Sequence, residues 1–155
     1  MMRRHAGFSL LELTVVLVVI GLFFAVGAPA ASRLFDTMQY RESVGVLASA
    51  AKKARRQSLT SGRPVDLLID TDQNAYHITD EGAAPDLDQF SKLDGEIALT
   101  VVYAAEVAPE PGLATIRFYP AGGSSGGDIT VTRTSGVGTR LVVDWLLGDV
   151  VTEAL

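Results

Sequence analysis

The sequence predicts an α+β fold in which one long N-terminal α-helix packs on antiparallel β-sheet structure. Residues 13–32 form a run of 20 positions without a charged side chain, and apolar residues recur at helical spacing beyond it. After Gly62 the chain changes to short runs of β-forming residues, separated by turns, with no helical pattern between them. Such strands pair antiparallel, because parallel neighbours need long crossover connections.

The uncharged run is long enough for a membrane span, since about 20 apolar residues cross a bilayer core. Arg3 and Arg4 precede it, and basic residues beside a span stay in the cytoplasm, so the body of the chain is predicted to be exported. Glu12 interrupts the apolar pattern, although an acidic side chain in a membrane helix costs roughly 2.5–3.5 kcal/mol. Cleavage after Gly7 would create an amino group on Phe8 that offsets this charge in the same or a neighbouring chain. Alternatively, Glu12 marks the interfacial edge of the helix.

Beyond Pro29 the helix is predicted to become amphipathic. One face carries a stripe at spacings of three and four residues that should pack on the sheet: Tyr40, Val44, Leu47, Ala51, Ala54 and Ser58. The opposite side carries Arg41, Glu42, Lys52, Lys53, Arg55 and Arg56. Gly62 and Pro64 form a stop signal. Pro29 is expected to kink the helix by a bend or a local unwinding, because proline removes a backbone donor and clashes with the preceding turn.

Strands are predicted at residues 65–69, 76–79, 97–103, 114–119, 129–133 and 140–145, with Val150 and Val151 as a further edge strand. The first two form a hairpin across residues 70–75, and the last two full strands pair across residues 134–139. Residues 81–89 and the glycine–serine segment 121–127 are expected to be loops. Trp145 is expected to lie in the core, since aromatic side chains in strands usually pack there.

The charge balance limits the partners. The chain has 13 basic and 18 acidic residues, and removal of a leader that contains Arg3 and Arg4 leaves 11 basic ones. An acidic exported body makes nucleic acid an unlikely partner, because Lys and Arg make most phosphate contacts. The cluster Lys52, Lys53, Arg55 and Arg56 keeps DNA binding open, although a solvated helix end is the more usual role of such a cluster. With no cysteine in the chain, no disulfide contributes to the fold.

The N-terminal residues closely resemble the prepilin signature shared by type IV pilins and type II secretion pseudopilins. The signature joins a short basic leader, the sequence Gly7-Phe8-Ser9-Leu10-Leu11-Glu12 and an apolar run that contains Pro29. The resemblance implies that a prepilin peptidase cleaves between Gly7 and Phe8 and methylates the amine of Phe8. It also implies that Glu12 guides assembly by meeting the amino terminus of a neighbouring subunit.

The C-terminal half resembles the H-type minor pseudopilins of type II secretion, which are grouped with the FimT-like minor pilins. In that class a strand ending in phenylalanine-x-proline leads into a glycine–serine loop and the next strand. Residues 116–120 here read Ile-Arg-Phe-Tyr-Pro, and after Ala121 come Gly122, Gly123, Ser124, Ser125, Gly126 and Gly127. These six residues are a candidate contact loop for a neighbouring subunit or a secreted client.

The resemblance implies a pilin-like fold and a structural role in a pseudopilus that helps to export folded proteins across the outer membrane. Its implied partners are other pseudopilins in a filament, the prepilin peptidase, the inner-membrane secretion platform and membrane lipid. Four segments are expected: a leader at 1–7, a transmembrane helix at 8–32, an amphipathic helix at 33–62 and a periplasmic β-rich domain at 63–155. The protein would cross the bacterial inner membrane once, with its N-terminus in the cytoplasm.

Two alternatives stay open from the sequence. The first is a minor pilin of a type IV pilus that primes assembly, adheres to surfaces or takes up DNA. The second belongs to another class and is a single-pass membrane sensor or a tethered ligand-binding domain.

Two further patterns suggest a metal site or a catalytic serine, and neither is complete. Asp70, Asp72, Asn74 and Glu81 stand at positions one, three, five and twelve of a calcium-loop pattern. Ala75 replaces the glycine that this loop requires, so a plain hairpin turn is favoured. Gly122, Ser124 and Gly126 fit a nucleophile elbow, but a strand follows them in place of a helix, and only His77 remains as a base once the leader is removed. The sequence therefore predicts no metal, no cofactor and no enzymatic activity.

Overall fold

The computed structural model describes residues 10–83, 85–108 and 112–155, and the chain divides into two compact units, Met1–Thr37 and Met38–Leu155. Helix α1 (Leu10–Ser61) contributes to both units. The strands are β1 (Val65–Asp70), β2 (Ala75–Asp80), β3 (Ser91–Lys92), β4 (Ile97–Tyr103), β5 (Leu113–Phe118), β6 (Gly127–Arg133), β7 (Gly138–Val143) and β8 (Val150–Ala154). Two short 3₁₀ helices, η1 (Leu87–Gln89) and η2 (Ala105–Val107), lie in the connections.

In the first unit the described residues are helical. The backbone of α1 stays helical through Pro29, so the helix does not unwind there. The other predicted effect of this proline, a bend of the helix, stays a prediction.

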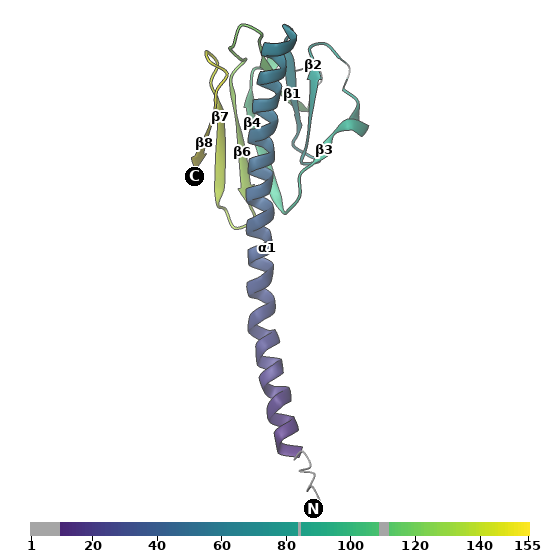
Figure 1. The fold of residues 1–155 in the computed structure, drawn as a ribbon, viewed down its shortest axis with the longest axis vertical. Helices are drawn as coiled ribbons and strands as arrows, with labels where there is room; N and C mark the ends of the chain where they lie inside the picture. Colours follow the sequence, from purple (N-terminus) through teal and green to yellow (C-terminus); the bar gives the residue numbers. More distant parts are fainter. Residues whose placement is uncertain (1–9, 84, 109–111) are drawn as a thin grey trace, which may run out of the picture. The chain divides into compact units, whose positions relative to one another are not determined.

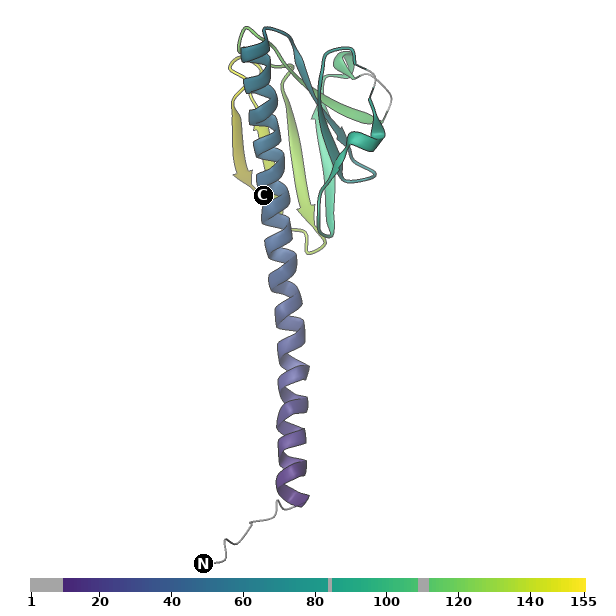
Figure 2. The same cartoon turned by 45° about the vertical axis from the view of Figure 1, so that its right-hand side comes forward.

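The second unit contains two antiparallel four-stranded sheets. Their strand orders are β3-β2-β1-β5 and β4-β6-β7-β8. The part of α1 from Met38 onward lies in front of both sheets, with β7 and β8 on one side of it and β1 to β3 on the other (Figure 1). The turned view keeps this helix segment against the strands (Figure 2). The predicted α+β fold is confirmed.

The core of this unit lies between the helix and the two sheets. Leu47, Ala51 and Ala54 on the helix are fully buried in one cluster with side chains from both sheets, which include Ile116 and Ile129. The small alanine side chains allow the helix backbone to approach the strands closely. Burial of this stripe confirms the face predicted from the spacing of three and four residues.

Polar contacts also hold the helix to the strands. Tyr40 Oη lies 2.6 Å from Thr139 Oγ1 on β7, and Ser43 donates its hydroxyl to the carbonyl of Asp94 at 2.7 Å. At the end of the helix the Gly62 amide donates to the carbonyl of Ser58, and Gly62 has a φ of +69°, the left-handed geometry of a helix stop. The predicted stop signal is therefore confirmed.

The predicted strands all form, and β8 is the predicted edge strand, but β7 ends earlier than expected. Its last residue is Val143, so Trp145 lies in the turn to β8 and is 68% exposed. The prediction that Trp145 lies in the core was wrong. The reason is the side chain of Asp144, whose Oδ1 accepts hydrogen bonds from the amides of Leu146 and Leu147 and turns the chain away from the sheet.

Candidate functional site

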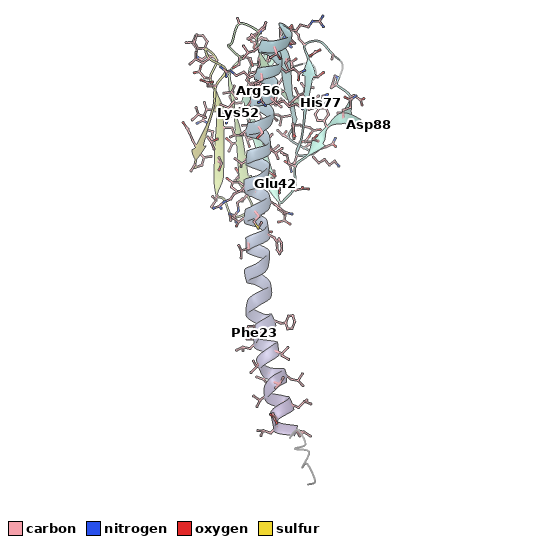
Figure 3. All side chains as sticks on the ribbon, viewed as in Figure 1. Phe23, Glu42, Lys52, Arg56, His77 and Asp88 are labelled. Atoms are coloured by element: carbon pink, nitrogen blue, oxygen red, sulfur yellow. The ribbon has the colours of Figure 1, made fainter. Side chains whose placement is uncertain are left out.

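The predicted processing site lies just before the first residue that the structure describes. Gly7 and Phe8 lie outside the described residues, and Glu12 lies exposed in the first turn of α1. The side chains that follow are large, apolar and exposed as well; Leu13, Val16, Leu17, Leu22, Phe23 and Phe24 are examples. Phe23 projects away from the helix in Figure 3. An apolar surface of this extent is typical of contact with lipid or with another protein.

Within residues 10–83, 85–108 and 112–155, no helix combines the length and the apolar character that crossing a membrane requires.

The glycine–serine segment 122–127 is bonded to its surroundings on two sides. Toward β5, the Ser125 amide donates to the carbonyl of Arg117, and the Ser125 hydroxyl accepts from the Arg117 amide at 3.0 Å. Toward the β7–β8 turn, Ser124 donates its amide to the carbonyl of Trp145 and its hydroxyl to the carbonyl of Asp144, each at 2.9 Å. The segment thus joins the first sheet to the second through defined contacts.

At two positions in this segment the backbone passes so close to a neighbouring carbonyl oxygen that only glycine fits. A Cβ on Gly123 would lie 2.9 Å from the carbonyl oxygen of Trp145, and one on Gly127 would lie 2.5 Å from that of Val102. Gly127 also has a φ of +139°, a backbone conformation that residues other than glycine rarely adopt. The glycines therefore have a structural role at the crossing between the sheets.

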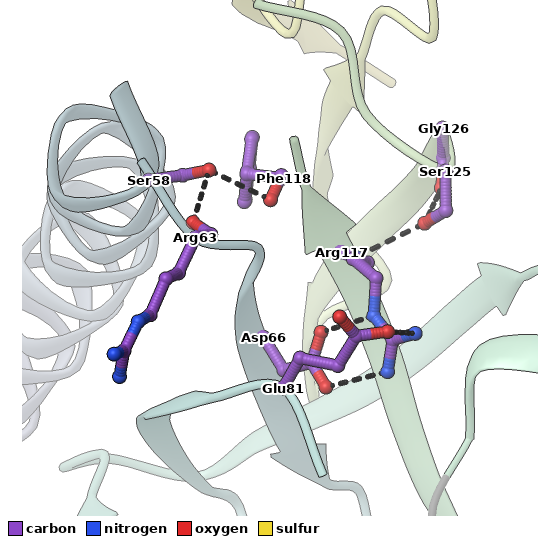
Figure 4. A network of polar contacts seen from close by, with 8 residues as sticks. All are labelled: Ser58, Arg63, Asp66, Glu81, Arg117, Phe118, Ser125 and Gly126. Atoms are coloured by element: carbon purple, nitrogen blue, oxygen red, sulfur yellow. Dashed lines mark hydrogen bonds and ion pairs between the residues drawn. The ribbon is translucent and has the colours of Figure 1, made fainter. Parts of the chain in front are cut away.

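Arg117 forms the most buried ion pair of the described residues (Figure 4). Its Nε and Nη2 atoms lie 2.7 and 2.8 Å from the two carboxylate oxygens of Asp66, and its Nη1 atom lies 2.5 Å from Glu81. Hydrogen bonding to Asp66 raises the pKa of Arg117, against the opposing effect of burial, and the charges of Asp66 and Glu81 raise it further. Beside this network, Ser58 at the helix end donates toward the carbonyl of Phe118 at 2.9 Å.

The basic cluster of the helix divides into two kinds of side chain. Arg55 reaches the β7–β8 turn, where it bonds to the carbonyl of Leu147 and lies 3.2 Å from Asp149. Lys52, Lys53 and Arg56 are exposed on the helix, and Lys52 and Arg56 lie on its front in Figure 3. Arg55, which was predicted to lie on the solvated face, therefore holds the helix to the β7–β8 turn.

The residues of the calcium-loop pattern form a hairpin turn and a separate ion pair. Asp70 Oδ1 accepts hydrogen bonds from the amides of Asp72 and Gln73 between β1 and β2, and Asn74 donates to the carbonyl of Ile97. Glu81 bonds to Arg117. In the described residues no group of three or more His, Cys, Asp or Glu side chains is placed so that it could hold a metal ion. The hairpin predicted across residues 70–75 is confirmed by the antiparallel pairing of β1 with β2.

The serine of the elbow pattern is engaged in structural hydrogen bonds. Ser124 is buried and bonds to Asp144 and to the amide of Gly126, whereas His77 Nδ1 lies 3.1 Å from the carbonyl of Gln89 and its ring stacks on Phe90. Strand β6 follows the elbow, as predicted. Ser124 therefore contributes to the junction between the sheets.

Comparison with known proteins decides among the predicted functions. Residues 44–147 match the family described as Type II transport protein GspH, which covers more than half of the chain. The chain belongs to this family of minor pseudopilins. Residues 2–28 in addition match the Prokaryotic N-terminal methylation motif, so the GspH family and the prepilin signature predicted from the sequence are both confirmed.

Relatives of this GspH-family chain agree with the assignment. The Type II secretion system protein H of Xanthomonas campestris pv. campestris is 28% identical over 148 residues, which are 96% of this chain and 83% of that protein. Two solved structures of the minor pseudopilin EpsH from the type II secretion system of Vibrio cholerae share the fold. The first has a TM-score of 0.58 at 12% sequence identity, and the match covers 75% of this chain and 97% of that structure's chain. The second has a TM-score of 0.55 at 11% identity, and the match covers 76% of this chain and 93% of that structure's chain.

Membership of the GspH family has three consequences. The protein is a minor pseudopilin of type II secretion, so the type IV pilus and sensor alternatives are set aside. Its role is structural and not enzymatic, as predicted. The family also implies filament partners and processing by a prepilin peptidase.

Proposed function

We propose that this GspH-family subunit is anchored in the bacterial inner membrane by residues 8–32 and presents residues 33–155 in the periplasm. There it assembles with other pseudopilins into a pseudopilus, on an inner-membrane secretion platform, and helps to export folded proteins across the outer membrane. Within the periplasmic part, residues 33–62 form the helix of the domain and residues 63–155 its β-rich portion.

The N-terminal methylation motif is the observation that supports this proposal most strongly. Its match at residues 2–28 includes Gly7, Phe8 and Glu12. Prepilin peptidase would cleave between Gly7 and Phe8 and methylate the new amine. The exposed apolar side chains of α1 that follow support an anchor, because lipid and neighbouring helices are the surroundings in which such a surface is stable.

Glu12 supplies the charge that would direct assembly. Its carboxylate lies in the first helical turn of an apolar segment, where a nearby cation lowers the free energy of placing the charge in lipid. The amine of Phe8 on a neighbouring subunit is such a cation. Pairing of this kind would set the register of one subunit against the next.

Processing can be tested with the full chain. Co-expression with an active prepilin peptidase should yield a mature chain that begins with N-methylated Phe8, measured by intact mass and terminal peptide sequencing. Gly7→Leu should leave the leader attached. A mature chain that still begins at Met1 in the presence of active peptidase would contradict the proposal, as would normal secretion in cells that lack the protein.

A further inference from the structure

The turn between β7 and β8 exposes three consecutive large apolar side chains. Trp145, Leu146 and Leu147 are 68%, 61% and 57% exposed, although leucine and tryptophan are among the more buried residue types in proteins. Val151, at the start of β8, is exposed as well. We call residues 144–149 the Trp145 turn.

The backbone of the Trp145 turn is fixed by its own hydrogen bonds. Asp144 Oδ1 accepts from the amides of Leu146 and Leu147 at 2.8 and 2.7 Å, and the Asp144 carbonyl accepts from the Gly148 amide at 2.9 Å. The Asp144 amide in turn donates to the carbonyl of Asp149. The exposed side chains are therefore presented by an ordered turn.

Two other elements hold the turn from outside. Arg55 on α1 places Nε and Nη2 at 3.1 and 2.9 Å from the carbonyl oxygen of Leu147 and pairs with Asp149. On the other side Ser124 bonds to the carbonyls of Trp145 and Asp144. Bonds from three parts of the fold thus fix the backbone and leave the apolar side chains outside. Binding to such a preorganised surface loses little conformational entropy.

A basic hollow lies beside the turn. It has a volume of about 590 Å³ and is lined by Ser49, Lys52, Arg55 and Arg56 from the helix and by residues 148–151 from the turn and β8. Arg55 is paired with Asp149, whereas in the described ranges neither Lys52 nor Arg56 forms an ion pair. The hollow is therefore complementary to a carboxylate.

We propose that the Trp145 turn and this hollow dock another pseudopilin subunit of the same filament. The partner presents an apolar depression to Trp145, Leu146 and Leu147, and a carboxylate to Lys52 and Arg56. This inference rests on the filament role proposed above. It also changes the expected role of the glycine–serine segment, which supports the contact surface through Ser124 and need not touch the partner itself.

The chemistry of the surface favours a filament subunit over a secreted client. Permanent interfaces are more apolar than transient ones, and tryptophan is enriched at the centres of interfaces. A surface used only in brief encounters with clients would spend most of its time in water, where exposed apolar patches promote aggregation. A neighbouring subunit keeps the patch covered.

Photo-cross-linking in cells that contain the complete secretion system tests the proposal. The full-length chain carries a benzophenone amino acid in place of Leu146, and a matched chain carries it in place of Val137, an apolar side chain 51% exposed in the β6–β7 turn. Irradiation of the Leu146 probe is expected to link the chain to a second pilin-type subunit, identified by mass spectrometry. The Val137 probe is expected to give at least about ten-fold less of this product.

A third probe separates failure of this inference from failure of the proposed function. Placed at Leu17 in the apolar part of α1, it should link to other pseudopilins wherever the chain enters a filament. Products from Leu17 with none from Leu146, or equal yields from Leu146 and Val137, would overturn the docking surface alone. Absence of products from all three probes would overturn the filament role as well.

Charge reversal tests the basic part of the surface. Lys52→Glu combined with Arg56→Glu should lower the Leu146 cross-link by about ten-fold, because two favourable charge contacts become repulsive. Glu42→Lys, on an exposed part of the same helix, is the control and should leave the yield unchanged. Equal yields from the double variant and the control would contradict the proposed carboxylate contact.

Discussion

Arg117 joins two strands and the end of a hairpin through one guanidinium group. Asp66 on β1 and Arg117 on β5 are direct cross-strand partners, and Glu81 follows the end of β2. The Asp66 side chain is 4% exposed and that of Arg117 is 17% exposed. The pKa of Arg117 is higher in the folded protein than the ordinary pKa of arginine. The ion pair therefore stabilises the fold fully at any pH below that ordinary value, and this stabilisation is lost only as the pH rises through the raised pKa. The pair should therefore contribute equally across the neutral range.

Asp66→Asn should lower the free energy of unfolding of the second unit by roughly 3–5 kcal/mol, since it leaves a largely buried guanidinium without its bidentate partner. Pulse proteolysis of the full-length chain in a urea series measures this change. Asp149→Asn is the matched control, because the Asp149 side chain is 56% exposed and exposed ion pairs contribute at most about 1 kcal/mol. Equal effects of the two variants would show that burial of the Asp66 pair has no energetic consequence.

At the scale of the elements, the connection from β5 to β6 is the one whose amino-acid sequence is most restricted by the fold. Strand β6 begins at Gly127, whose neighbour across the sheet is Tyr103 at the end of β4. A methyl group at this position would approach the carbonyl oxygen of Val102 to 2.5 Å, and backbone atoms cannot move aside as the end of a flexible side chain can. The strand must therefore begin with glycine.

Gly127→Ala should destabilise the domain by about 3 kcal/mol or more, because backbone strain and a backbone clash add together. Gly136→Ala is a close control: Gly136 also has a positive φ, +85°, but a Cβ added there would meet nothing within 4 Å. This control should lose only about 1 kcal/mol. Hydrogen exchange of the β4 and β6 amides would report the difference, and similar protection in both variants would contradict the role given to close approach.

The sequence predicted the elements whose patterns are local. The buried stripe of α1 follows from its spacing, and the strands follow from short β-forming runs bounded by turn residues. The end of β7 was missed because Trp145, Leu146 and Leu147 continue an apolar run, while the turn depends on the carboxylate of Asp144. Asp144 followed by Gly148 was the available signal for this turn.

Contacts between distant parts of the chain could not be predicted in the same way. Arg55 and Leu147 are separated by 92 positions, so only the folded structure brings the guanidinium to this carbonyl. Strand β3 has two exposed residues, and its pairing with β2 depends on where the preceding loop returns. The candidate contact loop at 122–127 was located from a family resemblance, but its hydrogen bonds to the Trp145 turn required the fold.

At the scale of the whole molecule, α1 has two different surfaces along its length. The large apolar side chains described in its first part are exposed, whereas its second part buries the stripe from Tyr40 to Ser58 in the domain. One covalent helix therefore connects a surface suited to lipid and neighbouring helices with a folded domain. Changes near Glu12 should alter assembly and leave the stability of the domain unchanged.

Glu12→Gln distinguishes the two roles considered for this residue. If the carboxylate pairs with the Phe8 amine of a neighbour, loss of its charge should reduce incorporation into the filament by about ten-fold or more, because charge-assisted hydrogen bonds contribute roughly 1.5–3 kcal/mol. If Glu12 only marks the interfacial edge of the helix, glutamine is polar enough to replace it and incorporation should be normal. Incorporation is measured by the yield of the Leu17 cross-link in membranes, with the amount of processed chain as the reference. Glu12→Asp keeps the charge on a shorter side chain and should restore part of the yield, a result that polarity alone does not explain.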